Sequence, residues 1–170
     1  MRLRALALVA VLGATVLVGA GQAQAKTEAK TLTFKVDLTS QGTTLHNLPG
    51  DITYGWNHLA GPTKWGGKKA DLEFLGNVDY VSGTGPFGGY VTVTRSDGTQ
   101  LAWSVSGWAT APSDQAGTAN AKFAGTLTVI GGSKSYEGAV GTGRMTGYRK
   151  SALGSPVQLT FTVTVERPAS

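Results

Sequence analysis

Aromatic side chains gather in the middle of the sequence, and they are the residues best suited to hold a flat apolar molecule. They include Tyr54, Trp56, Trp65, Phe74, Tyr80, Trp103 and Trp108. Ligand sites are mostly apolar and carry a few polar groups that orient the ligand. Two interpretations stay open: these rings fill a protein core, or some of them line the mouth of a ligand pocket, with Trp65 acting as a cover.

Four polar side chains, Asp79, Arg95, Arg144 and Tyr148, would complete such a pocket if they point inward. An arginine inside a protein needs a carboxylate partner, because an unpaired buried charge is costly. Asp79 or Glu73 would supply that partner. Such a pair would orient a polar ligand or steer an intramolecular cyclisation. The alternative is that these residues face solvent.

Other patterns that could carry chemistry fail on their context. Residues 83–88 match the Gly-x-Gly-x-x-Gly of dinucleotide sites, but a strand follows them and not the required helix. His46 and His58 are the only histidines and the chain has no cysteine, so no metal site is expected. No Gly-x-Ser-x-Gly and no nucleophile–base pair is present, so catalytic residues stay unassigned and no cofactor is expected. The candidate ligand-binding residues are therefore Tyr54, Trp56, Trp65, Tyr80, Trp103, Arg144 and Tyr148.

The elements that must position these residues are β-strands, because apolar and polar residues alternate with a period of two. Strands are predicted at 31–38, 52–56, 70–81, 90–95, 100–110, 123–130, 140–148 and 157–166. Asp97-Gly98 predicts a tight hairpin between two of them. Polar loops are expected at 39–50 and 111–119, and a turn at 83–89. Residues 57–69 contain Pro62 and three glycines and are predicted to form a long irregular loop, of the kind that serves as a lid.

Eight strands without a convincing helix after the first 25 residues indicate an all-β fold. Short connections favour antiparallel neighbours. The first and last strands carry matching apolar faces and would pair to close the sheet. The prediction is a single eight-stranded, antiparallel, up-and-down β-barrel, whose interior just fits side chains or one small ligand. An open β-sandwich is the alternative.

Two glycine-rich segments resemble turns of a known group of barrels. Residues 131–143, GGSKSYEGAVGTG, are similar to the turn of the allene oxide cyclase and dirigent-like β-barrels, except that Lys134 stands where a glycine is common. Residues 85–89, GPFGG, resemble the Gly-Pro-Phe turn of the same superfamily. Glycines at alternate positions of the strand at 140–148 mark close backbone approach in a strongly curved sheet. The resemblance implies the eight-stranded barrel, and it assigns no catalytic or pocket residue to this chain.

The first 25 residues read as a cleaved signal peptide. Arg2 and Arg4 precede an apolar run, and Ala23-Gln24-Ala25 is a small-x-small cleavage site. A membrane anchor is the alternative, but the apolar run is short for a span. Residues 26–170 then form one domain of a bacterial exported protein, secreted or periplasmic, with no disulfide and no membrane span. Removing Arg2 and Arg4 from the 15 basic residues leaves 13 against 10 acidic ones, a dispersed net charge of +3 that does not indicate nucleic-acid binding.

Three functions stay open at this point. The first is an exported barrel that binds a small hydrophobic molecule in or at the mouth of the barrel. The second is a cyclase or isomerase of the allene oxide cyclase type, which confines a reactive substrate. The third is a structural protein whose barrels form a homo-oligomer. A cavity with buried ionisable groups would favour the enzyme, an apolar cavity without them the binding protein, and a filled interior the structural protein.

Overall fold

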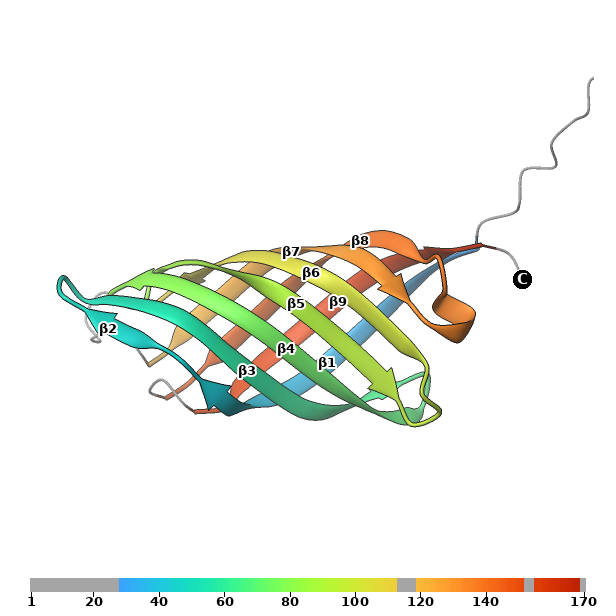
Figure 1. Cartoon of the computed structure of the whole chain (residues 1–170), viewed down its shortest axis with the longest axis horizontal. Helices are drawn as coiled ribbons and strands as arrows, with labels where there is room; N and C mark the ends of the chain where they lie inside the picture. The colour runs from blue at the N-terminus through green and yellow to red at the C-terminus, as the bar shows by residue number, and fades with distance from the viewer. Residues whose placement is uncertain (1–27, 113–118, 152–154, 169–170) are drawn as a thin grey trace, which may run out of the picture.

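The chain folds into a closed antiparallel β-barrel (Figure 1). The computed structural model describes residues 28–112, 119–151 and 155–168. The predicted signal peptide at 1–25 lies outside the described residues. No helix within the described ranges has the length and apolar character needed to cross a membrane.

From β2 onward, each strand pairs with the one that follows it along the chain, as the short connections predict. The elements are β1 (Glu28–Thr43), β2 (His46–Leu48), β3 (Ile52–Trp65), β4 (Lys68–Val81), β5 (Gly85–Arg95), β6 (Gln100–Thr110), β7 (Ala121–Gly132), the 3-10 helix η1 (Lys134–Tyr136), β8 (Val140–Arg149) and β9 (Val157–Arg167). Eight long strands form the barrel, and the short β2 adds to β3 at one end.

β1 closes the barrel because it pairs along both of its edges. Residues 28–38 of β1 pair with β9, and residues 39–43 pair with β3 across a small irregularity between Ser40 and Gly42. The predicted pairing of the first and last long strands is confirmed. Because the sheet closes on itself, the barrel interpretation is confirmed over the open β-sandwich.

The prediction of a long loop at 57–69 is wrong. Residues 57–65 belong to β3 and residues 68–69 to β4, and the turn between them is only Gly66 and Gly67. These two glycines have φ values of +60° and +80°, the left-handed conformation that a two-residue hairpin turn requires. Pro62 lies just beyond Ala60, where the β1–β3 ladder ends. A proline has no N–H to continue that ladder, so this residue made the segment look like a loop. Trp65 therefore ends a strand and does not sit on a covering loop.

Two other predicted boundaries also shift, each toward longer strands. The predicted polar loop at 39–50 instead holds the last residues of β1 and the whole of β2. The strand predicted at 90–95 begins at Gly85, so most of the predicted turn at 83–89 is strand. In both places glycine or polar residues occupy strand positions, so the alternation that indicates a strand is missing from the sequence.

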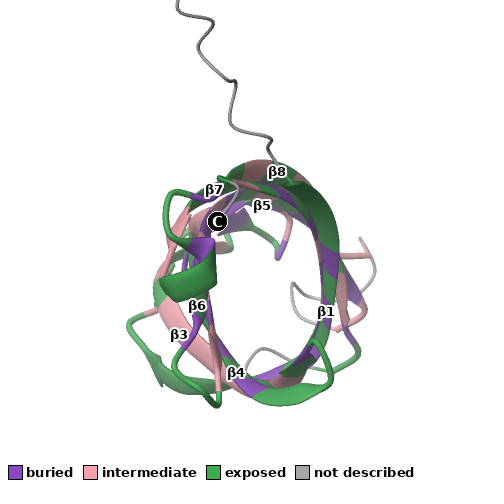
Figure 2. Cartoon of the chain, turned by 90° about the vertical axis from the view of Figure 1, so that its right-hand side faces the viewer, coloured by how far each residue is buried: buried purple, intermediate pink, exposed green. Residues whose placement is uncertain are grey.

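Alternate side chains point into the barrel, and aromatic rings fill the half near the β5–β6 turn. Figure 2 shows buried and exposed positions alternating around the ring of strands. Phe34 stacks on Trp103 with centroids 5.6 Å apart, and the edge of Trp65 meets Phe34 at 5.9 Å. Tyr136 of η1 lies 4.8 Å from Trp65, and the Arg95 guanidinium lies 5.2 Å from the Trp65 ring. This end of the barrel is closed by packed rings.

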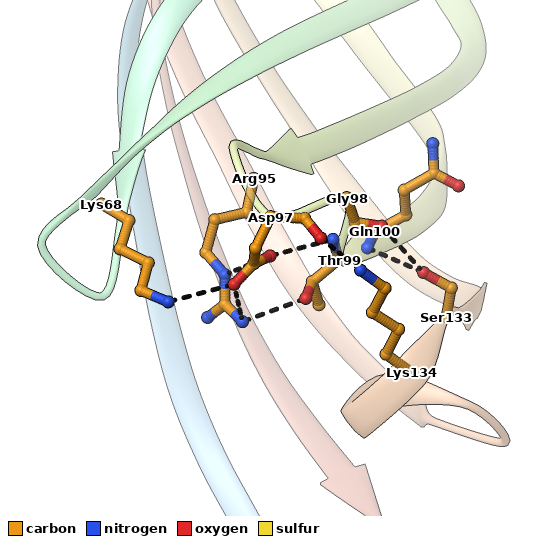
Figure 3. Close-up of polar contacts among 8 residues, drawn as sticks. All are labelled: Lys68, Arg95, Asp97, Gly98, Thr99, Gln100, Ser133 and Lys134. Atoms are coloured by element: carbon orange, nitrogen blue, oxygen red, sulfur yellow. Dashed lines mark hydrogen bonds and ion pairs between the residues drawn. The ribbon is translucent and has the colours of Figure 1, made fainter.

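The carboxylate of Asp97, in the β5–β6 turn, stabilises the same end of the barrel through several hydrogen bonds (Figure 3). Asp97 accepts hydrogen bonds from Arg95 Nε at 3.0 Å, from the Thr99 amide at 3.1 Å and from Lys68 Nζ at 3.1 Å. The hydrogen bonds from Arg95, and then those from Thr99, hold the pKa of Asp97 well below its usual range. Lys134 adopts a positive φ of 55°, which explains why a glycine is common there, and its ammonium donates to the Asp97 carbonyl.

Alternating glycines let β8 lie close against β9, as the sequence predicts. A Cβ at Gly143 would lie 2.2 Å from the Thr162 carbonyl oxygen, and one at Gly147 would lie 2.2 Å from the Leu159 side chain. Both distances are far below van der Waals contact. The tight curvature of this part of the barrel therefore depends on the absence of side chains.

We predict that Gly143→Ala destabilises the barrel, because the added methyl group meets backbone that cannot move aside. The free energy of unfolding should fall by about 1–3 kcal/mol, and Tm by about 3–10 °C, measured by thermal and urea unfolding. Gly42→Ala is the matched control, because a Cβ there meets nothing within 4 Å. Equal Tm values for the two variants would contradict this explanation.

Candidate functional site

A cavity of about 70 Å³ lies inside the barrel at the end opposite the Asp97 turn. Its walls come from β1, β3, β4, β5, β7, β8 and β9. The apolar lining residues are Leu45, Leu59, Phe74, Gly76, Val78, Phe87, Phe123, Met145, Val157 and Leu159. The polar lining residues are Ser40, Asn57, Asn77, Tyr80, Arg149 and Ser155. An apolar chamber with a few polar groups is the usual composition of a small-molecule site.

Arg149 is the buried cation of this cavity. It ends β8 with only 4% of its surface exposed, and its guanidinium carbon lies 5.8 Å from the centre of the Phe123 ring. Burial lowers the pKa of the Arg149 guanidinium, while the nearby Tyr80 acts in the opposite direction. Arginine starts from so high a pKa that it keeps its charge inside proteins. Arg149 therefore contributes a permanently charged guanidinium to the cavity wall.

Tyr80 supplies a neutral hydroxyl beside that charge. It lies near the end of β4 and is 5% exposed. Burial raises the pKa of the Tyr80 hydroxyl well above its usual value, and the positive charge of Arg149 offsets only part of this effect. The hydroxyl consequently stays protonated at neutral pH and can donate a hydrogen bond.

Two further polar side chains are tied to each other near the seam between β1 and β3. The hydroxyl of Ser40 donates to Asn57 Oδ1 at 2.6 Å. Asn57 occupies an inward position of β3, where Thr43 of β1 pairs with it. This bond fixes the orientation of the amide group, so the cavity presents placed polar atoms between apolar walls.

The chemistry available here is binding and orientation. Apolar walls can take up the body of a molecule, and donors on Tyr80 and Arg149 can hold an oxygen atom of that molecule. The same donors would stabilise negative charge that develops on such an oxygen. No group of three or more His, Cys, Asp or Glu side chains is placed to hold a metal ion within residues 28–112, 119–151 and 155–168.

Of the predicted ligand-binding residues, the structure brings only Tyr80 to the cavity. Trp65 and Trp103 lie in the packed core of the barrel, which agrees with the core interpretation of these rings. Tyr54 and Trp56 are exposed on the outer face of β3. Trp108 also faces outward, so it and Trp103 lie on opposite faces of β6, as their spacing predicts.

The remaining polar candidates lie elsewhere. Arg144 is exposed on the outer face of β8, and Asp79 and Glu73 are exposed on the outer face of β4, so the predicted interior ion pair is not formed. Tyr148 is partly buried, and its hydroxyl donates to Asn120 Oδ1. Arg95 lies at the closed end with Asp97.

Sequence reasoning missed Arg149, although a signal for it exists. Arg149 continues the inward parity of Gly143, Met145 and Gly147 along β8. The predicted strand stopped at residue 148, one residue too early. Asn57 was missed for a related reason, since it fell in the segment predicted as a loop.

We predict that in Tyr80→Phe the free energy of unfolding falls less steeply than in the parent protein as the pH rises into the alkaline range. The pKa of Tyr80 is raised in the folded state above its unfolded value of about 10. Its stabilising contribution is therefore complete below pH of about 10 and declines as the pH rises further, because unfolding then releases a proton. Urea unfolding between pH 8 and pH 11 measures this slope. A variant that loses stability with pH as steeply as the parent protein would contradict the raised pKa of Tyr80 as the cause.

Comparisons with known proteins found similar structures but no match in sequence. No protein-family model matches the chain, and no curated protein matches it in sequence. A solved structure of the pterocarpan synthase dirigent protein GePTS1 is similar, with a TM-score of 0.50 and 12% identity over 85% of this chain and 93% of that one. That of the pterocarpan synthase dirigent protein PsPTS1 has a TM-score of 0.46 and 12% identity, covering 84% of this chain and 97% of that one. The similarity to GePTS1 is one of fold alone, and this fold is the β-barrel that the glycine-rich turns of the chain predict.

Proposed function

We propose that this chain is an exported barrel that binds one small hydrophobic molecule, with an oxygen acceptor, in the cavity at the end of the barrel opposite the Asp97 turn. The observation that carries this proposal is the pair of buried polar side chains, Tyr80 and Arg149, set among apolar side chains. A few polar groups set among apolar walls are the usual means by which a small-molecule site orients its ligand. A bound oxygen would accept hydrogen bonds from both groups.

The size of the cavity limits the ligand. At about 70 Å³ it is well below the roughly 300–1,000 Å³ of sites for drug-sized molecules. The ligand is therefore a small molecule, or only one end of a larger molecule enters the barrel. Phe74, Phe87 and Phe123 offer ring faces and edges, which suits a flat or unsaturated body.

A cyclase or isomerase is the second candidate, and one specific observation favours it. The cavity contains two buried ionisable side chains, which a purely apolar binding site would not need. Tyr80 could donate to an oxygen that gains negative charge, Arg149 could stabilise that charge, and the walls would restrict the shape of the substrate. Cyclisation of an unstable epoxide faster than in buffer, with the rate gain lost in Tyr80→Phe, would select this candidate over simple binding.

The structural-oligomer hypothesis receives less support. A barrel with a filled interior would favour it, but a cavity of about 70 Å³ remains beside the packed rings of Phe74, Phe87 and Phe123. Such a cavity has no role in a purely structural barrel.

Export is supported by the charged, apolar and small-residue segments that precede residue 26. We predict that the full chain, expressed in a bacterium with a functional export system, is recovered outside the cytoplasm as a protein that begins at Lys26. N-terminal sequencing and intact mass measure this directly. Recovery of the uncut chain from the cytoplasm or the membrane would contradict it.

We predict that Leu59→Trp blocks the cavity, because the larger ring would occupy the space between β3 and the phenylalanine side chains. Methyl benzoate, one ring with an ester oxygen, serves as the probe, and its affinity is measured by NMR titration. Leu59→Trp should weaken binding at least tenfold, and Tyr80→Phe should weaken it about two- to tenfold through the loss of one hydrogen bond.

Ile130→Trp on the outer surface is the control and should leave the affinity unchanged. Unchanged binding in both cavity variants would refute the site. Native mass spectrometry of protein purified from the exporting cell would show whether a natural ligand is retained.

A further inference from the structure

Five large apolar side chains are exposed together on the outside of the barrel. They are Tyr54 (54% exposed), Trp56 (50%), Leu75 (50%), Tyr90 (60%) and Trp108 (53%), and we call them the outer platform. They belong to β3, β4, β5 and β6, which lie side by side on the face turned toward the viewer in Figure 1. Singly exposed apolar side chains are ordinary, whereas apolar side chains that gather on one face of a protein indicate a binding surface.

The centre of the outer platform is a row of four residues, one from each strand, in which three small residues follow Trp56. Trp56 pairs with Asn77, Asn77 with Gly88, and Gly88 with Ser106, so the row crosses four strands. A Cβ at Gly88 would lie 3.3 Å from Asn77 Oδ1, so the missing side chain leaves room for the Asn77 amide. The row begins with an indole ring and continues with an amide, a bare backbone and a hydroxyl.

The other platform residues flank this row on both sides. Leu75 and Tyr90 form a cross-strand pair on one side of it. Tyr54 and Trp108 lie on the other side, each two residues along its strand from the row. With strands about 4.8 Å apart, Trp56 and Trp108 are separated by three strand intervals, or about 14 Å across the sheet.

A second copy of the chain fits this surface poorly. An aromatic side chain presents about 150–250 Å², so four half-exposed rings offer about 400 Å². A standard interface buries about 800 Å² on each partner, of which about 65%, or about 520 Å², is apolar in homodimers, so the rings fall short of this apolar area. The polar row also divides the apolar area, whereas stable subunit interfaces have a continuous apolar core.

We propose that the outer platform binds an extended, uncharged polysaccharide chain. Sugar rings have apolar C–H faces that stack on aromatic rings, and hydroxyl rims that pair with amides and hydroxyls. The central row offers the amide of Asn77 and the hydroxyl of Ser106, and it contains no ionised side chain. A chain laid along this row would contact Trp56 first and would pass between Tyr90 and Trp108. Asn77 is the one residue of this row that also lines the interior cavity, and the five exposed side chains of the outer platform do not line it, so the inference does not depend on the ligand proposed there.

Binding to named polysaccharides tests the proposal. The full-length expressed protein is mixed with insoluble cellulose and, separately, with insoluble chitin, and the bound fraction is measured by sedimentation. Cellohexaose and chitohexaose are then titrated while the fluorescence of the exposed tryptophans is recorded. The parent protein should bind at least one of these chains. Trp56→Ala and Trp108→Ala should each weaken that binding at least tenfold.

Val140→Ala on β8 is the control, because Val140 is equally exposed and lies outside the outer platform. It should leave binding unchanged, and thermal unfolding should show that all three variants fold like the parent protein. Absence of binding to all four carbohydrates would overturn the proposal, as would binding that survives both tryptophan substitutions. Size-exclusion chromatography that shows an oligomer of the parent protein, dispersed by Trp56→Ala, would also overturn it, because the surface would then be an interface between copies.

Discussion

The whole structure depends on β1 pairing with two partners. Its first residues hold β9 and its last residues hold β3, so one continuous strand closes the sheet into a ring. Closure fixes which side of every strand faces inward, because side chains alternate between the two faces. With eight long strands, the ring is just wide enough for side chains or one small molecule. The filled core, the end cavity and the outer platform all follow from that single closure.

The two ends of the barrel differ in how they are packed. At one end, Trp65 and Tyr136 pack together, and Asp97 joins the β5–β6 turn to its neighbours. At the other end, Tyr80 and Arg149 stand in a partly empty chamber. A firmly packed end can hold the fold, which allows polar groups at the opposite end that packing alone would not favour. This division separates the residues that stabilise the barrel from those available to a ligand.

Alternation was sufficient to predict the strand class and the pairing of the first and last strands, and the Asp97-Gly98 dipeptide predicted the tight turn between β5 and β6. It failed at residues 57–65, because the inward positions of β3 carry Asn57, Gly61 and Thr63 instead of large apolar groups, and Pro62 lies at the seam. The candidate site was harder to predict. A sequence shows which face a residue occupies but not which end of the barrel it reaches, so Trp65 and Tyr80 looked alike. Arg149 could have been found by continuing the parity of β8 one residue further.

We propose that the end of the barrel opposite the Asp97 turn is a ligand site built around Tyr80 and Arg149. A crystal structure of protein purified directly from the exporting cell, without added small molecules, tests it most directly. We expect electron density for a small molecule between the phenylalanine side chains, with an oxygen within hydrogen-bond distance of the Tyr80 hydroxyl or the Arg149 guanidinium. A chamber closed by collapsed side chains, with bound density only outside the barrel, would contradict it.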